Sequence, residues 1–321
     1  MQKAPPTPKG FRDILPDTAK KRREVINIIA GVLQEAGFVP LETPTIEFAE
    51  TLTGKYGEEE KLIYKFKDRG DRSLALRYDL TVPLARFIAN NQNLLKPSFS
   101  RYQIGQVFRG ENPQHGRYRE FTQFDFDTVG SNNFEDDAKI IATAINCIRK
   151  VGLKEATLLI NDRANFAETP VEVIRAVDKL HKIGEEQVKE ELKSQNMAHD
   201  DIENHLFKIK NSKPTENLLK IFELLESKHS LKTDVDFTFD PTLARGLDYY
   251  TGAIFEMKPS KDPAALTIGS GGRYDNLIGM FVYPDKGGGQ KQIPAVGFSF
   301  GIDRLIETLS GSILDHGYLC T

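Results

Sequence analysis

The sequence predicts an α+β fold in which an antiparallel β-sheet is flanked by helices and interrupted by a helical insertion. Two runs of alternating residues, separated by a polar turn, indicate a long β-hairpin between residues 102 and 127. Apolar residues recur at helical spacing before and after this hairpin. A charged, helix-rich stretch at residues 163–232 interrupts the pattern and indicates an inserted module.

The length and composition are those of an ordinary globular protein. The chain has 321 residues, enough to bury a sizeable core. No apolar run approaches the ~20 residues of a membrane span, and the N-terminus lacks the apolar segment of a secretion signal. We therefore expect a cytoplasmic protein with no membrane partner. Cys147 and Cys320 have no metal-binding spacing, so we predict no metal site.

The N-terminal part predicts one helix and one kinked strand. The helix covers residues 17–36, and Gly37 ends it. The next segment, FVPLETPTIEF, is predicted as a strand broken by Pro40 and Pro44, which edge strands tolerate. Either the preceding helix or a second copy of the chain could cover this edge strand, and the residues alone do not distinguish these two possibilities.

A short hairpin and a helix follow. The segments KLIYKFKD and SLALRYDL are predicted as strands joined by a turn at residues 69–71. A helix is predicted at residues 81–90, with Pro83 in its first turn. Asp79 and Thr81 therefore lie where a strand ends and a helix begins. An acid and a hydroxyl at that place can cap the helix and do nothing else.

The central hairpin has one polar face. Its first strand ends at Phe108 and Arg109, and its return strand begins near Arg117. Side chains two residues apart on a strand share a face. One face of the return strand therefore carries Phe121, Gln123, Asp125 and Asp127, and the other carries Thr122, Phe124 and Phe126.

That polar face admits two interpretations. Burying an amide and two carboxylates costs several kcal/mol, roughly, unless a ligand bonds to them, but a solvated sheet face explains the strand equally well. Arg109, Arg117 and Arg119 on the same hairpin favour the ligand. Guanidinium groups and carboxylates on one sheet suit a substrate that carries both phosphate and amine.

The second half adds two further segments with polar side chains. In FDPTLARGLDYYTGAIFE, Tyr249 and Tyr250 precede a predicted strand from Ala253 to Met257. Adjacent tyrosines in extended chain project to opposite faces, so that one can pack in the core while the other reaches a site. IGSGGRYDNLIGMF is predicted as a glycine-rich turn that carries Arg273 and Tyr274. A helix at residues 133–151 and the strand TLLIND precede these segments.

The last segment, IPAVGFSFGIDRLIETL, predicts a strand through Phe300 and a helix from Ile302 that carries Asp303 and Arg304. Together with RYDLTVP, GRYREF, RGLDYYTG and GGRYD, it resembles the motifs of class II aminoacyl-tRNA synthetases, in the version of the histidyl enzymes. The resemblance covers residues 8–309, with Asn276 where glycine is usual. It implies a catalytic core without the C-terminal anticodon-binding domain.

The resemblance also implies a division of the chain and a set of roles. Residues 1–163 would form the first part of the catalytic domain, 164–234 the helical insertion, and 235–321 the second part of the catalytic domain. Arg109 and Arg245 would be catalytic. ATP would be bound by Arg109, Glu111, Arg117, Arg119 and Arg304, and histidine by Asp79, Thr81, Gln123, Asp127, Tyr249, Tyr250 and Tyr274.

The implied function is that of a histidine–tRNA ligase. Such an enzyme activates L-histidine with ATP and Mg²⁺ to histidyl-adenylate, and passes the histidyl group to the 3′ end of tRNA(His). The resemblance further implies a homodimer, and an insertion that contacts the acceptor stem of the tRNA.

Two alternatives share the fold. One is the non-catalytic, histidyl-synthetase-like regulatory subunit of ATP phosphoribosyltransferase, and the other is a free-standing ligase that transfers histidyl-adenylate to another acceptor. Regulatory paralogues usually lose the ATP arginines. The presence of Arg109, Arg117, Arg245 and Arg304 therefore favours an enzyme.

Overall fold

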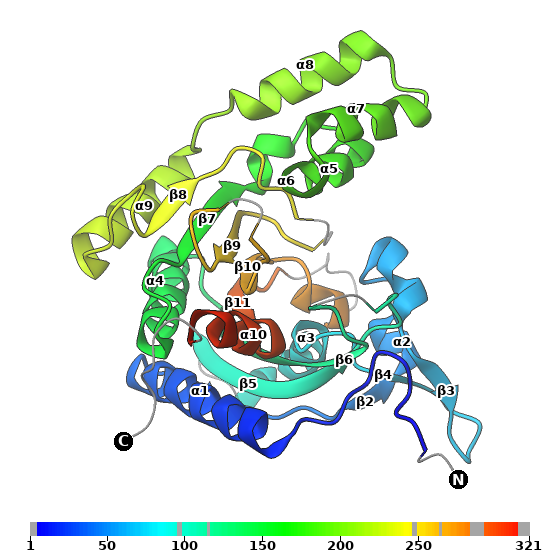
Figure 1. The fold of residues 1–321 in the computed structure, drawn as a ribbon. Coiled ribbons are helices and arrows are strands. Elements are labelled where there is room, and N and C mark those ends of the chain that lie inside the picture. The colour runs from blue at the N-terminus through cyan, green and yellow to red at the C-terminus, as the bar shows by residue number, and fades with distance from the viewer. Residues whose placement is uncertain are drawn as a thin grey trace.

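The computed structural model describes residues 5–94, 98–113, 116–245, 249–262, 265–282 and 292–313. Their strands form an eight-stranded sheet in the order β1-β5-β6-β11-β10-β9-β7-β8 and a three-stranded sheet in the order β2-β4-β3 (Figure 1). The strands are β1 (Val39–Pro40), β2 (Ile46–Phe48), β3 (Lys65–Lys67), β4 (Ser73–Leu76), β5 (Phe99–Phe108), β6 (Glu120–Val129), β7 (Thr157–Asp162), β8 (Phe237–Phe239), β9 (Ala253–Lys258), β10 (Gly269–Arg273) and β11 (Ala295–Gly301).

Helices precede, follow and interrupt the strands. Among the described residues, no helix is both long enough and apolar enough to cross a membrane. The α-helices are α1 (Pro16–Glu35), α2 (Ala49–Leu52), α3 (Thr81–Asn90), α4 (Phe134–Val151), α5 (Val171–Val177), α6 (Leu180–Ile183), α7 (Glu185–Ser194), α8 (His199–Lys210), α9 (Glu216–His229) and α10 (Ile302–Ile313). Short 3-10 helices occur at Gly57–Leu62, Gln92–Leu94, Arg163–Phe166 and Ile278–Phe281.

The large sheet is antiparallel in its centre and parallel at its edges. The strands from β5 to β7 in sheet order pair antiparallel, which confirms the predicted sheet. β1 pairs parallel with β5, and β8 pairs parallel with β7. Long stretches of chain separate the strands of both edge pairs, as parallel pairing requires. The return strand β6 begins at Glu120 rather than near Arg117.

One face of the large sheet holds the main core. The apolar sides of α1, α4, α9 and α10 pack against this face (Figure 1). Their contacts include Phe124 and Phe126 of β6, and Phe298 and Phe300 of β11. The predicted alternation of β6 is therefore confirmed. Because Phe124 and Phe126 point into the core, the polar residues between them point to the other face of the sheet.

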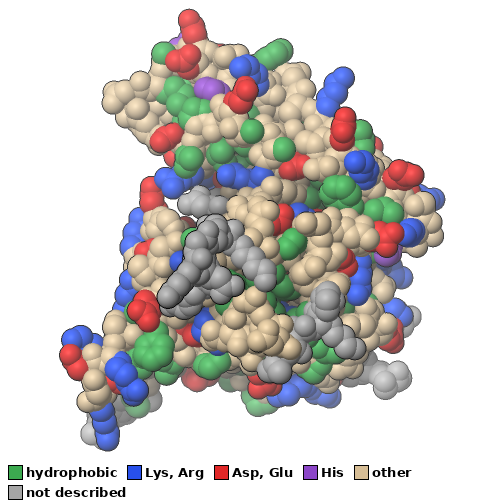
Figure 2. All heavy atoms as spheres, turned by 180° about the vertical axis from the view of Figure 1, so that it is seen from behind, with side chains coloured by type: hydrophobic (Ala, Val, Ile, Leu, Met, Phe, Trp, Pro, Cys, Tyr) green, Lys and Arg blue, Asp and Glu red, His purple; other side chains and the backbone are tan. Residues whose placement is uncertain are grey.

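The helical insertion forms a lobe apart from the main sheet, with charged side chains of both signs on its surface (Figure 2). Residues of α5, α7 and α8 share an apolar cluster that continues to α3. Helix α9 lies inside the predicted range 164–234, but Leu218, Ile221, Phe222 and Leu225 join the core against α4. We therefore propose that the insertion comprises α5 to α8 and that α9 belongs to the catalytic domain.

The predicted glycine-rich turn is wrong, because residues 269–273 form strand β10 between β9 and β11. A Cβ atom on Gly271 would lie 2.1 Å from the carbonyl oxygen of Gly297. The backbones of β10 and β11 approach too closely for a side chain at this position, and glycine permits the approach. The glycines of β10 therefore allow its backbone to pack closely against β11 in the middle of the sheet.

Candidate active site

The polar face of β6 is buried, so the solvated-face interpretation is wrong. Asp125 and Asp127 are 2% and 3% exposed. β5 and β11 pair with the two edges of β6, and Tyr274 contacts Asp127 on its polar face. Buried carboxylates in a central strand require partners, since their desolvation is costly. Their surroundings therefore define the candidate site.

Unsatisfied polar atoms gather at this place. Among the described residues, eight buried side-chain nitrogen or oxygen atoms have no hydrogen-bond partner. All except the Ser212 hydroxyl belong to Arg101, Gln123, Asp125, Asp127 and Arg245. Buried polar groups are nearly always hydrogen-bonded in proteins, and a cluster of exceptions needs an explanation, of which a ligand site is one. This concentration of donors and acceptors fits a polar ligand that is both cationic and anionic.

Asp127 is held by two partners. Its Oδ2 atom lies 2.6 Å from Nη2 of Arg101, and its Oδ1 atom accepts a hydrogen bond from the Tyr274 hydroxyl. On the neighbouring strand, a Cβ atom on Gly297 would lie 1.9 Å from Oδ1 of Asp127. Glycine at that position therefore leaves the space that the carboxylate fills. The structure brings the predicted residues Asp127 and Tyr274 into direct contact.

Asp125 is a site residue that the predicted set does not include. It shares the face of Gln123 and Asp127, which the alternation on the strand already indicates. Burial raises the pKa of Asp125 to about 7, while Arg101 opposes the rise and Asp127 adds to it. The Gln123 amide donates a hydrogen bond to the Ser299 hydroxyl at 2.9 Å. Asp125 therefore belongs to the same buried group of polar side chains as Asp127.

Asp79 has the capping role that the sequence allowed. Its Oδ1 atom accepts hydrogen bonds from the amide of Val82, in the first turn of α3, and from the Tyr56 hydroxyl, both at 3.0 Å. Burial raises the pKa of Asp79, and these hydrogen bonds and Arg109 oppose the rise. Thr81 is the first residue of α3, beside it. A buried carboxylate at this point remains suited to a ligand cation.

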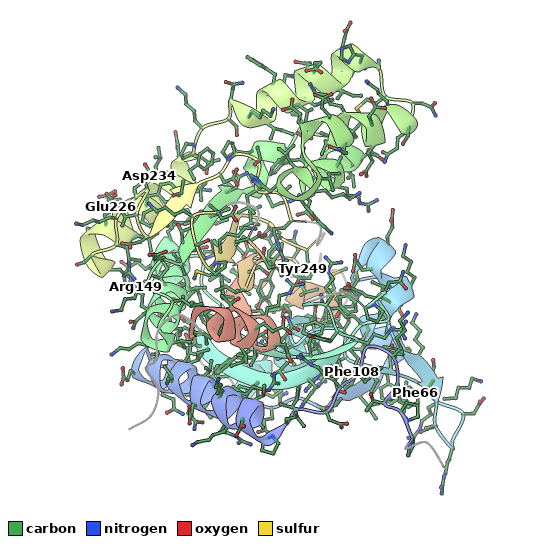
Figure 3. All side chains as sticks on the ribbon, viewed as in Figure 1. Phe66, Phe108, Arg149, Glu226, Asp234 and Tyr249 are labelled. Atoms are coloured by element: carbon green, nitrogen blue, oxygen red, sulfur yellow. The ribbon has the colours of Figure 1, made fainter. Side chains whose placement is uncertain are left out.

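The two adjacent tyrosines do not project to opposite faces, which corrects the prediction. Both precede β9, as predicted, but their ring centroids are only 4.9 Å apart. The Tyr249 ring also lies 6.0 Å from that of Tyr274. A Cβ atom on Gly272 would lie 2.7 Å from the Tyr250 ring. The three tyrosines form one aromatic wall, and Tyr249 lies near the middle of the molecule (Figure 3).

Two partly buried arginines stand at the predicted catalytic positions. Arg109 follows β5, where its Nε donates to the Tyr78 carbonyl at 3.2 Å and its guanidinium lies 4.3 Å from the centre of the Tyr78 ring. Arg245 donates to Glu256 at 3.0 Å and to the Ser270 hydroxyl at 2.9 Å. Residues 246–248 of the RGLDYYTG motif lie outside the described residues. Tyr78, which follows β4, thus holds the Arg109 guanidinium, and residues of β9 and β10 hold that of Arg245.

A third and a fourth arginine approach the first two. Arg304 of α10 donates to the Gly116 carbonyl at 2.9 Å and to the Thr267 carbonyl at 3.1 Å. Burial lowers the pKa of Arg304, and nearby positive charges lower it further, namely those of Arg117, Arg109 and Arg245. Three other guanidinium groups lie near enough to Arg304 to disfavour its charge, so this part of the site suits an anion. A polyphosphate supplies such an anion.

The remaining two predicted ATP residues lie in the loop of the hairpin. Glu111 is 3.3 Å from Arg117 in an ion pair. Arg119, however, donates to the main-chain carbonyls of Glu111 at 2.9 Å and Lys9 at 3.3 Å. Its guanidinium therefore joins the loop to the N-terminal segment.

The N-terminal segment also contacts α10, which the sequence did not predict. Arg12 pairs with Asp303 and Glu307, and its guanidinium lies 3.5 Å from the centre of the Tyr118 ring. Asp303 also accepts a hydrogen bond from the amide of Thr122. Asp303 thus connects β6, α10 and the N-terminal segment beside Arg304. No local pattern signals these contacts, because they join residues far apart in the chain.

Comparison with known proteins identifies the family. The protein-family model described as histidyl-tRNA synthetase matches residues 10–199 and 167–305. The histidine–tRNA ligase of Aeropyrum pernix is 41% identical, over 94% of this chain and 74% of the relative. That of Treponema denticola is 36% identical, over 96% of this chain and 73% of the relative.

Solved structures share the fold. The histidyl-tRNA synthetase of Nostoc sp. PCC 7120 has a TM-score of 0.76 at 28% identity, over all of this chain and 78% of that one. A Bacillus halodurans structure described as an ATP phosphoribosyltransferase regulatory subunit/histidyl-tRNA synthetase has a TM-score of 0.75 over 95% of this chain and 83% of that one, and at 24% identity it supports the fold alone. By sequence and by fold, the chain belongs to the histidyl-tRNA synthetase family of class II aminoacyl-tRNA synthetases.

Proposed function

We propose that this protein is a histidine–tRNA ligase, which activates L-histidine with ATP and transfers the histidyl group to the 3′ end of tRNA(His). The observation that carries the proposal is a buried site with two chemical halves. Carboxylates and tyrosines form one half, around Asp127, and four arginines form the other, around Arg304. Relatives 36–41% identical and named histidine–tRNA ligase favour the enzyme over the regulatory subunit.

The carboxylate half would select histidine. Asp127 would accept a hydrogen bond from one imidazole N–H, while Tyr250 pairs with the other nitrogen and Tyr274 orients the carboxylate. Gln123 and Asp79 would hold the α-ammonium group, with Thr81 and Tyr249 beside it. A pocket that pairs the polar edges of a side chain rejects analogues without them far better than an apolar pocket does.

The arginine half would bind ATP and stabilise the transition state. The substrate carboxylate attacks the α-phosphorus, and Arg109 and Arg245 would stabilise the charge that develops there. Arg304 and Arg117 would contact the distal phosphates, Glu111 would lie near the adenine, and Arg119 would fix the loop. Mg²⁺ commonly relies on few protein ligands, and when bound together with ATP it would neutralise charge on the triphosphate.

The proposal extends to partners. The lobe formed by α5 to α8 would contact the acceptor stem of tRNA(His). Exposed apolar side chains on β1, β2 and β3, namely Val39, Ile46, Phe48 and Phe66, support a homodimer through this region. We place the enzyme in the cytoplasm, where tRNA and ATP are available.

The direct test is histidine-dependent exchange of pyrophosphate into ATP, followed by charging of a tRNA(His) transcript. We expect exchange with histidine and not with other amino acids, and incorporation of labelled histidine into the tRNA. Exchange without charging would favour another acceptor. A folded protein that binds histidine but shows no exchange would favour the regulatory paralogue.

Substitutions of Asp79 separate its two roles. Asp79→Asn keeps a side chain that caps helices as well as aspartate does, so the melting temperature should change little. Asp79→Ala also removes the cap and should lower the free energy of unfolding by about 1 kcal/mol. Both variants lose the charge toward the α-ammonium group. We expect both to raise KM for histidine at least ~10-fold in the exchange assay. An unchanged KM in Asp79→Asn would leave Asp79 as a cap alone.

A further inference from the structure

Arg101 of β5 is fully buried, although no predicted role includes it. Its exposed fraction is 0%, and it lies directly opposite Asp127 in the register of β5 and β6. Arginine is almost never fully buried unless it is paired. The position of Arg101 therefore needs an explanation beyond the stability of the hairpin.

Arg101 and Asp127 form an ion pair without a well-aligned hydrogen bond. Nη2 of Arg101 is 2.6 Å from Oδ2 of Asp127, but the alignment of these two atoms does not meet hydrogen-bond geometry. Nε and Nη1 of Arg101 have no hydrogen-bond partner among the described residues either. A well-packed apolar pair often replaces a buried ion pair without loss of stability. Stability alone thus gives no reason for an arginine here.

The surroundings of Asp127 show what the arginine supplies. Asp127 faces Asp125 of the same strand, the Tyr274 hydroxyl and Gly297 of β11, which adds no side chain. Arg101 is the cation in contact with Asp127 among the described residues. Burial raises the pKa of Asp127, and Arg101 opposes this rise. Arg77 is also buried and interacts with the neighbouring Asp125, but among the described residues Arg101 is the cation paired with Asp127. Without Arg101, Asp127 would lose this pairing in a buried site next to another carboxylate, which favours its protonated form.

We propose that Arg101 is a positioning and specificity-determining residue, which keeps Asp127 ionised and oriented to accept the imidazole N–H of histidine. The inference rests on the proposed function, because it concerns recognition of the same substrate. A protonated Asp127 would present a donor in place of an acceptor. The arginine acts through Asp127 and does not touch the substrate in this account.

The first test is the exchange kinetics of Arg101→Leu. We expect KM for histidine to rise at least ~10-fold, because this is the effect of losing one hydrogen bond to a charged group. KM for ATP should stay within ~3-fold of the value for the unmodified protein. Arg101→Lys keeps the charge and should have an intermediate KM for histidine. Arg149→Leu is the matched control, since it breaks an arginine–aspartate pair with Asp236 at the outer end of α4 (Figure 3). It should leave both KM values unchanged.

A double-mutant cycle distinguishes action through Asp127 from general damage. Asp127→Asn should itself raise KM for histidine, and adding Arg101→Leu to it should raise KM by no more than ~3-fold further. The double variant removes both buried charges, so it should melt above Arg101→Leu, which leaves Asp127 unpaired. Independent, multiplicative effects on KM, or an unchanged KM in Arg101→Leu, would overturn the inference. Absence of exchange in the unmodified protein would instead refute the proposed function.

Discussion

Arg245→Ala is expected to abolish histidine-dependent pyrophosphate exchange while the protein stays folded. The arginine lies beside Glu256 and Ser270, at the junction of the two halves of the site. Removing one donor aimed at a developing charge typically lowers the rate ~10²–10³-fold, and a full guanidinium should cost at least that much. Glu256 keeps Lys258 at 2.9 Å as an ion-pair partner, so the substitution leaves no unpaired buried charge.

The measurement is the exchange rate at saturating histidine and ATP. We expect Arg245→Ala to lower the maximal rate with little change in KM for histidine, because the arginine would act on the transition state. Arg149→Ala, at the end of α4 and away from the site, is the control: it also removes an arginine that pairs with an acid, and it should leave the exchange rate unchanged. A maximal rate within ~3-fold of the unmodified protein would refute the catalytic role that we assign to Arg245.

Local sequence patterns predicted those helices and strands whose buried residues recur at regular spacing within one segment. Helices α1 and α4 have apolar residues at helical spacing, and the structure confirms both. The alternation of β6 likewise separates the core face, with Phe124 and Phe126, from the site face. Each of these predictions depends on one periodicity within one segment, and periodicity is what a sequence displays directly.

Elements defined by distant partners were predicted less well. The glycines of β10 suggest a turn locally, and only the close approach of β11 explains them as a strand. Helix α9 shares its charged composition with the insertion, yet packs on α4. Arg101 gave no signal, because its importance arises from cross-strand register with Asp127. Neither propensity nor spacing contains such information.

Gly297→Ala is expected to remove histidine binding by displacing the Asp127 carboxylate. The new Cβ atom would lie 1.9 Å from Oδ1 and 2.6 Å from Cγ of Asp127, far inside van der Waals contact. Asp127 has little freedom to move, since Arg101 and Tyr274 hold its two oxygens. Either the strands separate or the carboxylate leaves its position. Overpacking of this kind costs about 1–3 kcal/mol of stability.

Gly301→Ala on the same strand gives the matched control. Its added Cβ atom would lie 3.9 Å from the nearest heavy atom, the carbonyl oxygen of Ile268, an ordinary contact. We expect Gly297→Ala to lower the melting temperature and to raise KM for histidine ~100-fold or more, as loss of a charged hydrogen bond and its geometry would do. Gly301→Ala should leave the melting temperature and KM for histidine unchanged. A stable Gly297→Ala protein with normal affinity for histidine would mean that Asp127 does not contact the imidazole ring, since the methyl group cannot share its place.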